Sequence, residues 1–171
     1  KLRHSLGRPS RSDFVQSEFV EDRKMARSIH QQFKEEIFNY LDSFKNDYIE
    51  QRFDFQINDD CCSDNQIEVY WYYKNEYQPD KQTKCILLRF FINYEYRQVQ
   101  ISNIFLPDFM KHKGLGKMLI YKIFMITEKE NYELFLIDMV NSFYQKMIAR
   151  GALPCDACDD AVQIVRETKL F

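Results

Sequence analysis

The N-terminal part of the chain carries an amphipathic pattern of helical period. Between residues 13 and 52, large apolar side chains recur at spacings of three and four, and charged and amide side chains occupy the other positions. The recurring residues are Met25, Ile29, Phe33, Ile37, Leu41, Phe44 and Tyr48. Such a stripe is typical of a helix with one face on a core. We expect one long helix, or two with a break near residues 21–24; the part before Met25 could also contact a partner or form a homodimer.

After residue 52 the apolar positions change to the alternating period of strands. We expect four strands, at residues 53–57, 67–73, 85–92 and 99–106. The polar segment 93–98 has the length of a hairpin connection, and Pro107 should end the fourth strand.

The last third of the chain alternates between helix and strand. A helical pattern begins beside Gly116, an apolar strand follows at 133–140, and a helix at 141–150 should stop at Gly151. Two final strands are expected at 161–165 and 168–171. This order predicts an α+β (mixed α/β) fold with a single twisted, mostly antiparallel sheet flanked by helices.

Length and composition point to one folded domain. The 171 residues, 45% of them hydrophobic, suit a flexible basic tail at 1–12 and a single domain at 13–171. The net charge of -2 gives no sign of a broad nucleic-acid surface. No apolar run approaches the roughly 20 residues that span a bilayer, and no secretory signal is visible. We therefore expect a cytoplasmic protein without nucleic-acid or membrane partners.

The cysteines predict reduced thiols rather than a disulfide framework. There are five, an odd number, and two of them are adjacent. Cys155 and Cys158 form a lone C-x-x-C. A structural zinc site usually needs four ligands, and no second pair follows, so we expect no metal and ordinary thiols in a loop, with zinc as the alternative.

The strongest indication of a binding site lies where a predicted strand is followed by a predicted helix. Gly114 and Gly116 are two of only four glycines, and four basic residues surround them: Lys111, His112, Lys113 and Lys117. The first turn of a helix leaves main-chain N–H groups free and attracts anions, and glycine lets a phosphate approach closely. The dinucleotide pattern lacks its third glycine, since position 119 is Leu119, and the Walker pattern is absent. A tight strand-to-helix connection without a ligand is the alternative.

The spacing Lys111-x-x-Gly114-x-Gly116 resembles the Arg/Gln-x-x-Gly-x-Gly/Ala signature of the GNAT family of acetyl-CoA-dependent N-acetyltransferases. The order of elements from about Ile67 to Phe171 is also similar to that family. The resemblance implies a GNAT-like acyl-CoA N-acyltransferase fold and acetyl-CoA (coenzyme A) as cofactor. It implies transfer of the acetyl group by direct attack of an amine, on a small molecule or a protein. The alternative is a non-catalytic acyl-CoA-binding or partner-binding protein of the same fold.

The resemblance also implies a set of cofactor-binding residues. Main-chain groups before the motif would pair with the pantetheine arm, and the amides of the turn would hold the diphosphate. The implied residues are Ile104, Phe105, Leu106, Lys111, His112, Lys113, Gly114, Leu115, Gly116, Lys117 and Asn141.

Catalytic roles follow from the same resemblance. Tyr144 would protonate the leaving thiolate, with a core aromatic as its alternative role, and an N–H near Phe105 would polarise the thioester carbonyl. The strand before the motif lacks the glutamate that many relatives use as general base, so Glu95 and Glu68 are candidates by proximity. The acceptor groove would lie between the early helices and the strand and loop at 67–83. It could be lined by Tyr70, Tyr72, Tyr73 and Tyr77, with ordinary core and surface aromatics as the alternative.

Overall fold

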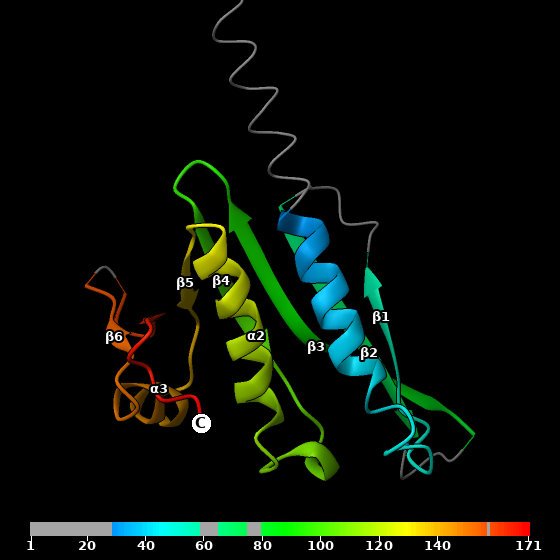
Figure 1. Cartoon of the computed structure of the whole chain (residues 1–171). Helices are drawn as coiled ribbons and strands as arrows, with labels where there is room; N and C mark the ends of the chain where they lie inside the picture. The colour runs from blue at the N-terminus through cyan, green and yellow to red at the C-terminus, as the bar shows by residue number, and fades with distance from the viewer. Residues whose placement is uncertain (1–28, 59–64, 75–79, 157) are drawn as a thin grey trace, which may run out of the picture.

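The computed structural model describes residues 29–58, 65–74, 80–156 and 158–171, and they form one seven-stranded sheet with helices packed against it (Figure 1). The predicted tail, the helical pattern before residue 29 and Tyr77 lie outside these residues. The strands are β1 (Asp54–Asn58), β2 (Gln66–Lys74), β3 (Gln82–Asn93), β4 (Gln98–Ile104), β5 (Glu133–Leu136), β6 (Leu153–Pro154) and β7 (Val162–Ile164). The helical elements are residues 29–42, the short 3-10 helix η1 (Asp108–Met110), α2 (Leu115–Lys129) and α3 (Asn141–Ile148).

The strand order in the sheet is β1-β2-β3-β4-β5-β7-β6. Neighbouring strands are antiparallel except β4 and β5, which run parallel. Strands β1 to β4 follow one another along the chain, whereas α2 provides the crossover from β4 to β5. This confirms the predicted α+β class and the single, mostly antiparallel sheet.

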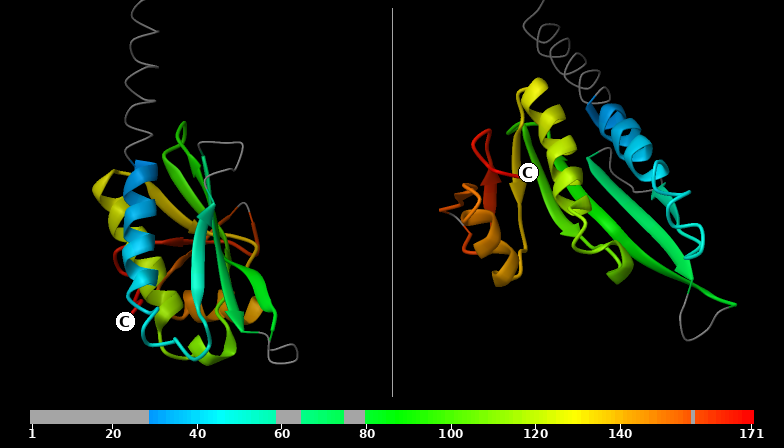
Figure 2. Two further views of the ribbon diagram at one scale, coloured as in Figure 1. Left: turned by 90° about the vertical axis from the view of Figure 1, so that its right-hand side faces the viewer. Right: turned by 60° about the horizontal axis from the view of Figure 1, so that its bottom comes forward.

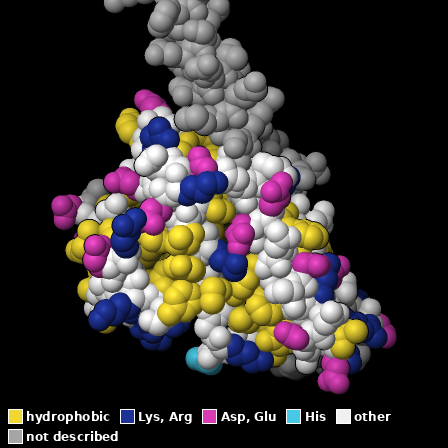
Figure 3. Space-filling view, in the orientation of Figure 1, with side chains coloured by type: hydrophobic (Ala, Val, Ile, Leu, Met, Phe, Trp, Pro, Cys, Tyr) yellow, Lys and Arg dark blue, Asp and Glu magenta, His cyan; other side chains and the backbone are white. Residues whose placement is uncertain are grey.

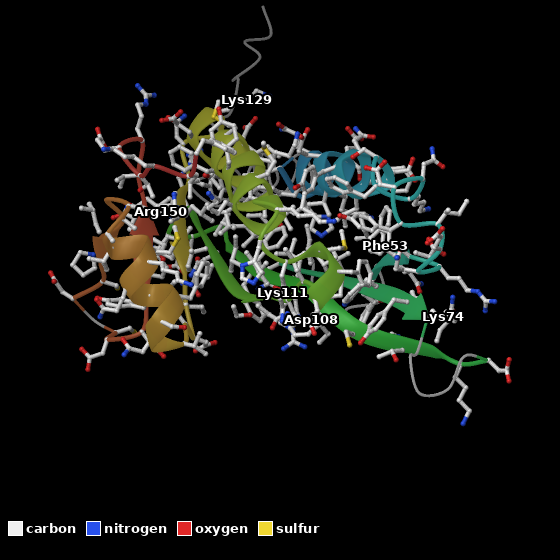
Figure 4. All side chains as sticks on the ribbon, turned by 90° about the horizontal axis from the view of Figure 1, so that it is seen from below. Phe53, Lys74, Asp108, Lys111, Lys129 and Arg150 are labelled. Atoms are coloured by element: carbon white, nitrogen blue, oxygen red, sulfur yellow. The ribbon has the colours of Figure 1, made fainter. Side chains whose placement is uncertain are left out.

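Two helices lie side by side on one face of the sheet. Figures 2 and 4 show helix 29–42 and α2 on the same side of the strands. The predicted stripe faces inward: Ile29, Phe33, Ile37 and Leu41 are all buried. Phe33 meets Phe90 of β3 edge to face, with ring centroids 5.1 Å apart. The side chains of Lys122 and Glu36 pair at 2.5 Å and join α2 to helix 29–42.

Several predicted element boundaries were wrong. The strand expected at 133–140 ends at Leu136, and Asp138 then adopts a left-handed backbone with φ 54°, which an extended strand cannot continue through. Residues 168–171 form no strand, because Thr168 closes a turn by accepting a hydrogen bond from the Val165 N–H at 3.0 Å. The short strand β6 after Gly151 was not predicted.

The chain then returns to α2, where the Phe171 ring lies 4.9 Å from that of Tyr121. Figure 3 shows hydrophobic side chains gathered on the face over α2. Met125 of α2 and Phe171 are both exposed large hydrophobic residues. None of the described helices is long and apolar enough to cross a membrane.

Candidate functional site

A cleft opens where β4 and β5 stop pairing. The last paired residues are Ile101 and Leu136, and the Ile137 N–H donates to the Ile101 carbonyl oxygen at 2.9 Å. Beyond that point β4 continues to Ile104 without β5 beside it. The cleft encloses about 170 Å³ and is lined by Ile101, Ser102, Asn103, Ile104, Leu136, Ile137, Asp138, Met139, Val140 and Phe143.

A bulge in β4 lies at the mouth of this cleft. Consecutive residues Arg89 and Phe90 of β3 pair with Asn103 and Ile101 of β4, so Ser102 is an extra residue on β4. A bulge bends its strand and increases the local twist. Since the β4–β5 pairing ends one residue before Ser102, the bulge provides a physical reason why the two strands part here.

The side chain of Asn103 links the bulged part of β4 to β3. Its side-chain Nδ2 donates to the carbonyl oxygen of Ile86 at 3.0 Å. Ile86 lies next to a second irregularity, because β2 residues Val69 and Tyr70 pair with Leu88 and Ile86 and skip Leu87. The side chain of Asn103, which lines the cleft, thus provides a hydrogen bond to the main-chain carbonyl of Ile86, next to the irregularity between β2 and β3.

The bulge also decides which main-chain N–H faces the cleft. The Phe105 N–H donates to the Leu87 carbonyl oxygen at 2.8 Å, on the β3 side of the strand. The expectation was an N–H near Phe105, and this bond shows that the Phe105 N–H itself is engaged with β3. Main-chain groups alternate between the two sides of a strand, so those of Ile104 point to the cleft side. The extra residue Ser102 shifts this alternation by one position. Without it, the main-chain groups of Phe105 would point to the cleft and those of Ile104 to β3.

The N-terminus of α2 is uncapped and open. Gly114 is the N-cap with φ 80°, no side chain caps the helix, and the first turn carries no acidic residue. The Met118 N–H makes the first internal bond, to the Gly114 carbonyl oxygen at 3.0 Å, so the N–H groups of Leu115, Gly116 and Lys117 precede the helical ladder. A Cβ at Gly114 would meet nothing within 4 Å. This end of the helix therefore offers main-chain donors and room for an anion.

Gly116 brings the start of α2 against the end of β4. A Cβ at Gly116 would lie 3.5 Å from the Leu106 side chain and 3.7 Å from that of Ile104. Ile104 itself lines the cleft. Ile104 thus lies near both the cleft and the first turn of α2.

Two of the basic residues at the turn are engaged within the protein. Lys111 pairs with Asp108 of η1 at 2.6 Å, and Figure 4 shows the two residues close together. The hydrogen bond and the charge of Lys111 hold the pKa of Asp108 below its usual value. The Nζ of Lys113 donates to the Tyr48 hydroxyl at 3.0 Å. His112 is exposed, with φ 62°.

Asn141 and Tyr144 do not line the cleft. From α3, Phe143 provides the lining side chain, whereas Tyr144 is half-buried against the core. The exposed Asn141 side chain accepts a hydrogen bond from Gln145 at 3.4 Å. Adjacent residues of a helix point about 100° apart, which is consistent with Phe143 lining the cleft while Tyr144 packs against the core.

Glu95 lies at the wrong end of β4 to act at this cleft. It is exposed in the turn between β3 and β4, three residues before Gln98, whereas the first residue of β4 that lines the cleft is Ile101. Three residue steps of strand, about 10 Å, separate Gln98 from Ile101, and Glu95 lies beyond Gln98. The structure therefore removes Glu95 from the candidate bases.

Glu68 is part of a buried polar network. It is 6% exposed, and its carboxylate accepts hydrogen bonds from Tyr70 at 2.7 Å, Arg89 at 2.5 Å and Gln66 at 2.9 Å. Burial raises the pKa of Glu68, but the hydrogen bonds from Tyr70 and Arg89 and the Arg89 charge outweigh it and lower the pKa. A carboxylate stabilised in its charged form is a weaker base, and we assign Glu68 a structural role.

The tyrosines of β2 do not form one groove. Lys84 lies over the rings of Tyr70 and Tyr72, at 4.1 and 5.8 Å from their centroids. Tyr73 instead stacks on buried Trp71, with centroids 4.5 Å apart. Alternation along the strand places these two groups on opposite faces of the sheet.

Asp138 is a functional candidate that the sequence analysis missed. Among the described residues that line the cleft, Asp138 alone has an ionisable side chain. Its left-handed backbone turns the chain at the carboxyl end of β5, beside the parallel pair, where ligands of open sheets bind. The available signal was an acidic residue within the apolar run 133–140.

No protein-family model, no curated protein and no solved structure matches this chain.

Proposed function

We propose that this protein is an acetyl-CoA-dependent N-acetyltransferase with a GNAT-like fold. The observation that carries the proposal is the position of Ile104, which lines the cleft and whose side chain would lie 3.7 Å from a Cβ placed at Gly116 in the first turn of α2. A ligand with a diphosphate at one point and an extended amide-containing arm beyond it can occupy both places at once. Coenzyme A has this construction.

The diphosphate would bind at the start of α2. The N–H groups of Leu115, Gly116 and Lys117 would donate to it, and the open space at Gly114 admits it. The positive end of the helix favours the charge of the diphosphate. The basic side chains at the turn would add further attraction, although Lys113 already bonds Tyr48.

The pantetheine arm would lie along β4 past its last pairing with β5. An extended amide chain can extend a sheet by main-chain hydrogen bonds where a strand has lost its neighbour. The N–H and carbonyl groups of Ile104 are the ones that alternation directs to this side. Ser102 and Asn103 would line the same wall of the cleft.

The residues of the cleft suggest a direct transfer. The Ile104 N–H would stabilise negative charge on the thioester oxygen as an amine attacks. Asp138 would accept the proton of the attacking amine as the C–N bond forms and the C–S bond breaks, and solvent would protonate the leaving thiolate. In this direct attack the acetyl group passes from sulfur to nitrogen without an acyl-enzyme.

A non-catalytic acyl-CoA-binding protein is the second candidate. Its support is that two of the expected catalytic residues, Tyr144 and Glu95, lie away from the cleft. Whether Asp138 acts as a general base therefore distinguishes the two candidate functions.

Calorimetric titration with acetyl-CoA tests the proposal, with pantetheine and adenosine 3′,5′-bisphosphate as the two halves of the ligand. We expect the whole cofactor to bind far more tightly than either half, because one ligand spans both places. Release of free thiol in the presence of a panel of amines then tests turnover. Binding without turnover on any amine would support the second candidate, and absence of binding would refute both.

A further inference from the structure

A main-chain hydrogen bond joins two cysteines between β6 and β7. The Cys158 N–H donates to the Cys155 carbonyl oxygen at 3.3 Å. A bond of this kind, from a residue to the third one before it, keeps the two Cα atoms within about 7 Å. Disulfides join residues whose Cα atoms are about 4.4–6.8 Å apart, so this bond places the two cysteines near the range that a disulfide needs.

Both thiols are free and open to reagents. Cys155 is half-buried and Cys158 is exposed. The described residues contain no group of three or more histidine, cysteine or acidic side chains arranged to hold a metal. Within the described part of the chain, a zinc ion bound to the two thiols would find fewer than the four protein ligands of a structural site.

The same loop supports the wall of the cleft. The Cys155 N–H donates to the Ala161 carbonyl oxygen at 3.1 Å, which closes the loop at its base. The Asp160 carbonyl oxygen accepts the Met139 N–H at 3.1 Å, and Met139 lines the cleft. A restraint on this loop is thus transmitted to the wall through one main-chain hydrogen bond.

We propose that Cys155 and Cys158 are a redox-active dithiol that closes to a disulfide and thereby stiffens the Met139 wall of the cleft. The oxidant is a low-molecular-weight disulfide such as glutathione disulfide. One cysteine thiolate attacks it and releases one glutathione thiol, and the other cysteine then attacks the mixed disulfide and releases the second. Two protein thiols are oxidised and one disulfide is reduced. This proposal is independent of the acetyltransferase function.

Peptide mapping of the full chain tests disulfide formation. Cleavage after Arg150 and Arg166 yields a peptide, residues 151–166, that contains Cys155 and Cys158 and no other cysteine. The chain is equilibrated in glutathione buffers of increasing oxidised fraction, quenched with acid and alkylated. We expect this peptide to lose both alkylation sites and to become lighter by two hydrogen atoms.

The variant Cys158→Ser is the matched control, and its peptide should carry one glutathione and form no internal bond. A parent peptide that stays doubly alkylated in oxidised buffer, or that carries two glutathiones, overturns the proposal. So does stoichiometric zinc binding that either Cys155→Ser or Cys158→Ser abolishes.

Hydrogen exchange tests the coupling to the cleft. In the oxidised chain, we expect the amide of Met139 to exchange roughly tenfold more slowly than in the reduced chain. A factor of this size corresponds to the chain entropy that a short disulfide loop removes. The reduced chain and oxidised-buffer Cys158→Ser are the references. An unchanged Met139 rate in a chain with the disulfide formed would overturn the coupling.

Discussion

The hydroxyl of Tyr40 donates a hydrogen bond to the carbonyl oxygen of Leu115, 2.8 Å away. Tyr40 belongs to helix 29–42, and Leu115 is the first residue of α2, so this bond fixes the start of α2 from the neighbouring helix. Burial, and secondarily the nearby Tyr48, raise the pKa of Tyr40 to about 12. A helix outside the cleft therefore helps to position the proposed diphosphate site.

We expect Tyr40→Phe to lower the free energy of unfolding by about 1 kcal/mol, the usual contribution of one hydrogen bond. The effect has a defined pH dependence, because the folded pKa lies above the unfolded value of about 10. The stabilisation is complete below pH 10 and is lost as the pH rises toward 12. Denaturant unfolding of both proteins across this window measures it. A stability difference that is constant to pH 12 would contradict the assignment.

Gly114→Glu should weaken coenzyme A binding about a hundredfold, or roughly 2.7 kcal/mol. The introduced carboxylate would occupy the space at the start of α2 and repel the diphosphate. Titration calorimetry measures the affinity. Gly114→Ala imposes the same left-handed strain without the charge, so it should lower stability while losing much less affinity. Parent-like affinity in Gly114→Glu would mean that the phosphates bind elsewhere.

Asp138→Asn should reduce turnover by a factor of about 10² to 10⁴, the usual contribution of a general base. Asparagine tolerates the left-handed backbone at this position, so the fold and coenzyme A affinity should be retained. Steady-state kinetics with the best amine measures the effect. Glu95→Gln makes the same chemical change at the far end of β4 and should leave turnover unchanged. Equal losses in the two variants would remove Asp138 from the mechanism.

Glu68→Gln should destabilise the fold by about 1–3 kcal/mol, because Arg89 loses its charged partner within a buried network. The pKa of Glu68 is lowered in the folded state, so its contribution is present above the unfolded pKa and is lost as the pH falls through the folded value. The stability gap between parent and variant should therefore close in acid. Unfolding curves from neutral to acidic pH test this expectation. Unchanged stability with abolished turnover would make Glu68 catalytic rather than structural.

Much of the local structure could be predicted from the chain alone. The stripe that includes Phe33 and Ile37 identified the buried face of a helix, and Gly114 and Gly116 marked the start of α2. These features depend on residues close in sequence, whose periodicity and backbone preferences are properties of the segment itself. The predicted phosphate function of the turn stays a prediction.

The details of the cleft depended on tertiary structure. Pairing of β4 with β3 makes Ser102 an extra residue, and this directs the main-chain groups of Ile104, rather than those of Phe105, to the cleft side. The packing of α3 turned Phe143 toward the cleft and Tyr144 away from its lining. Sequence spacing alone predicted most of the helices and strands approximately, because helical and strand periodicity are local, although several boundaries and β6 were missed. Strand register, bulge position and helix rotation are set by contacts between distant segments, and only the folded sheet decided them.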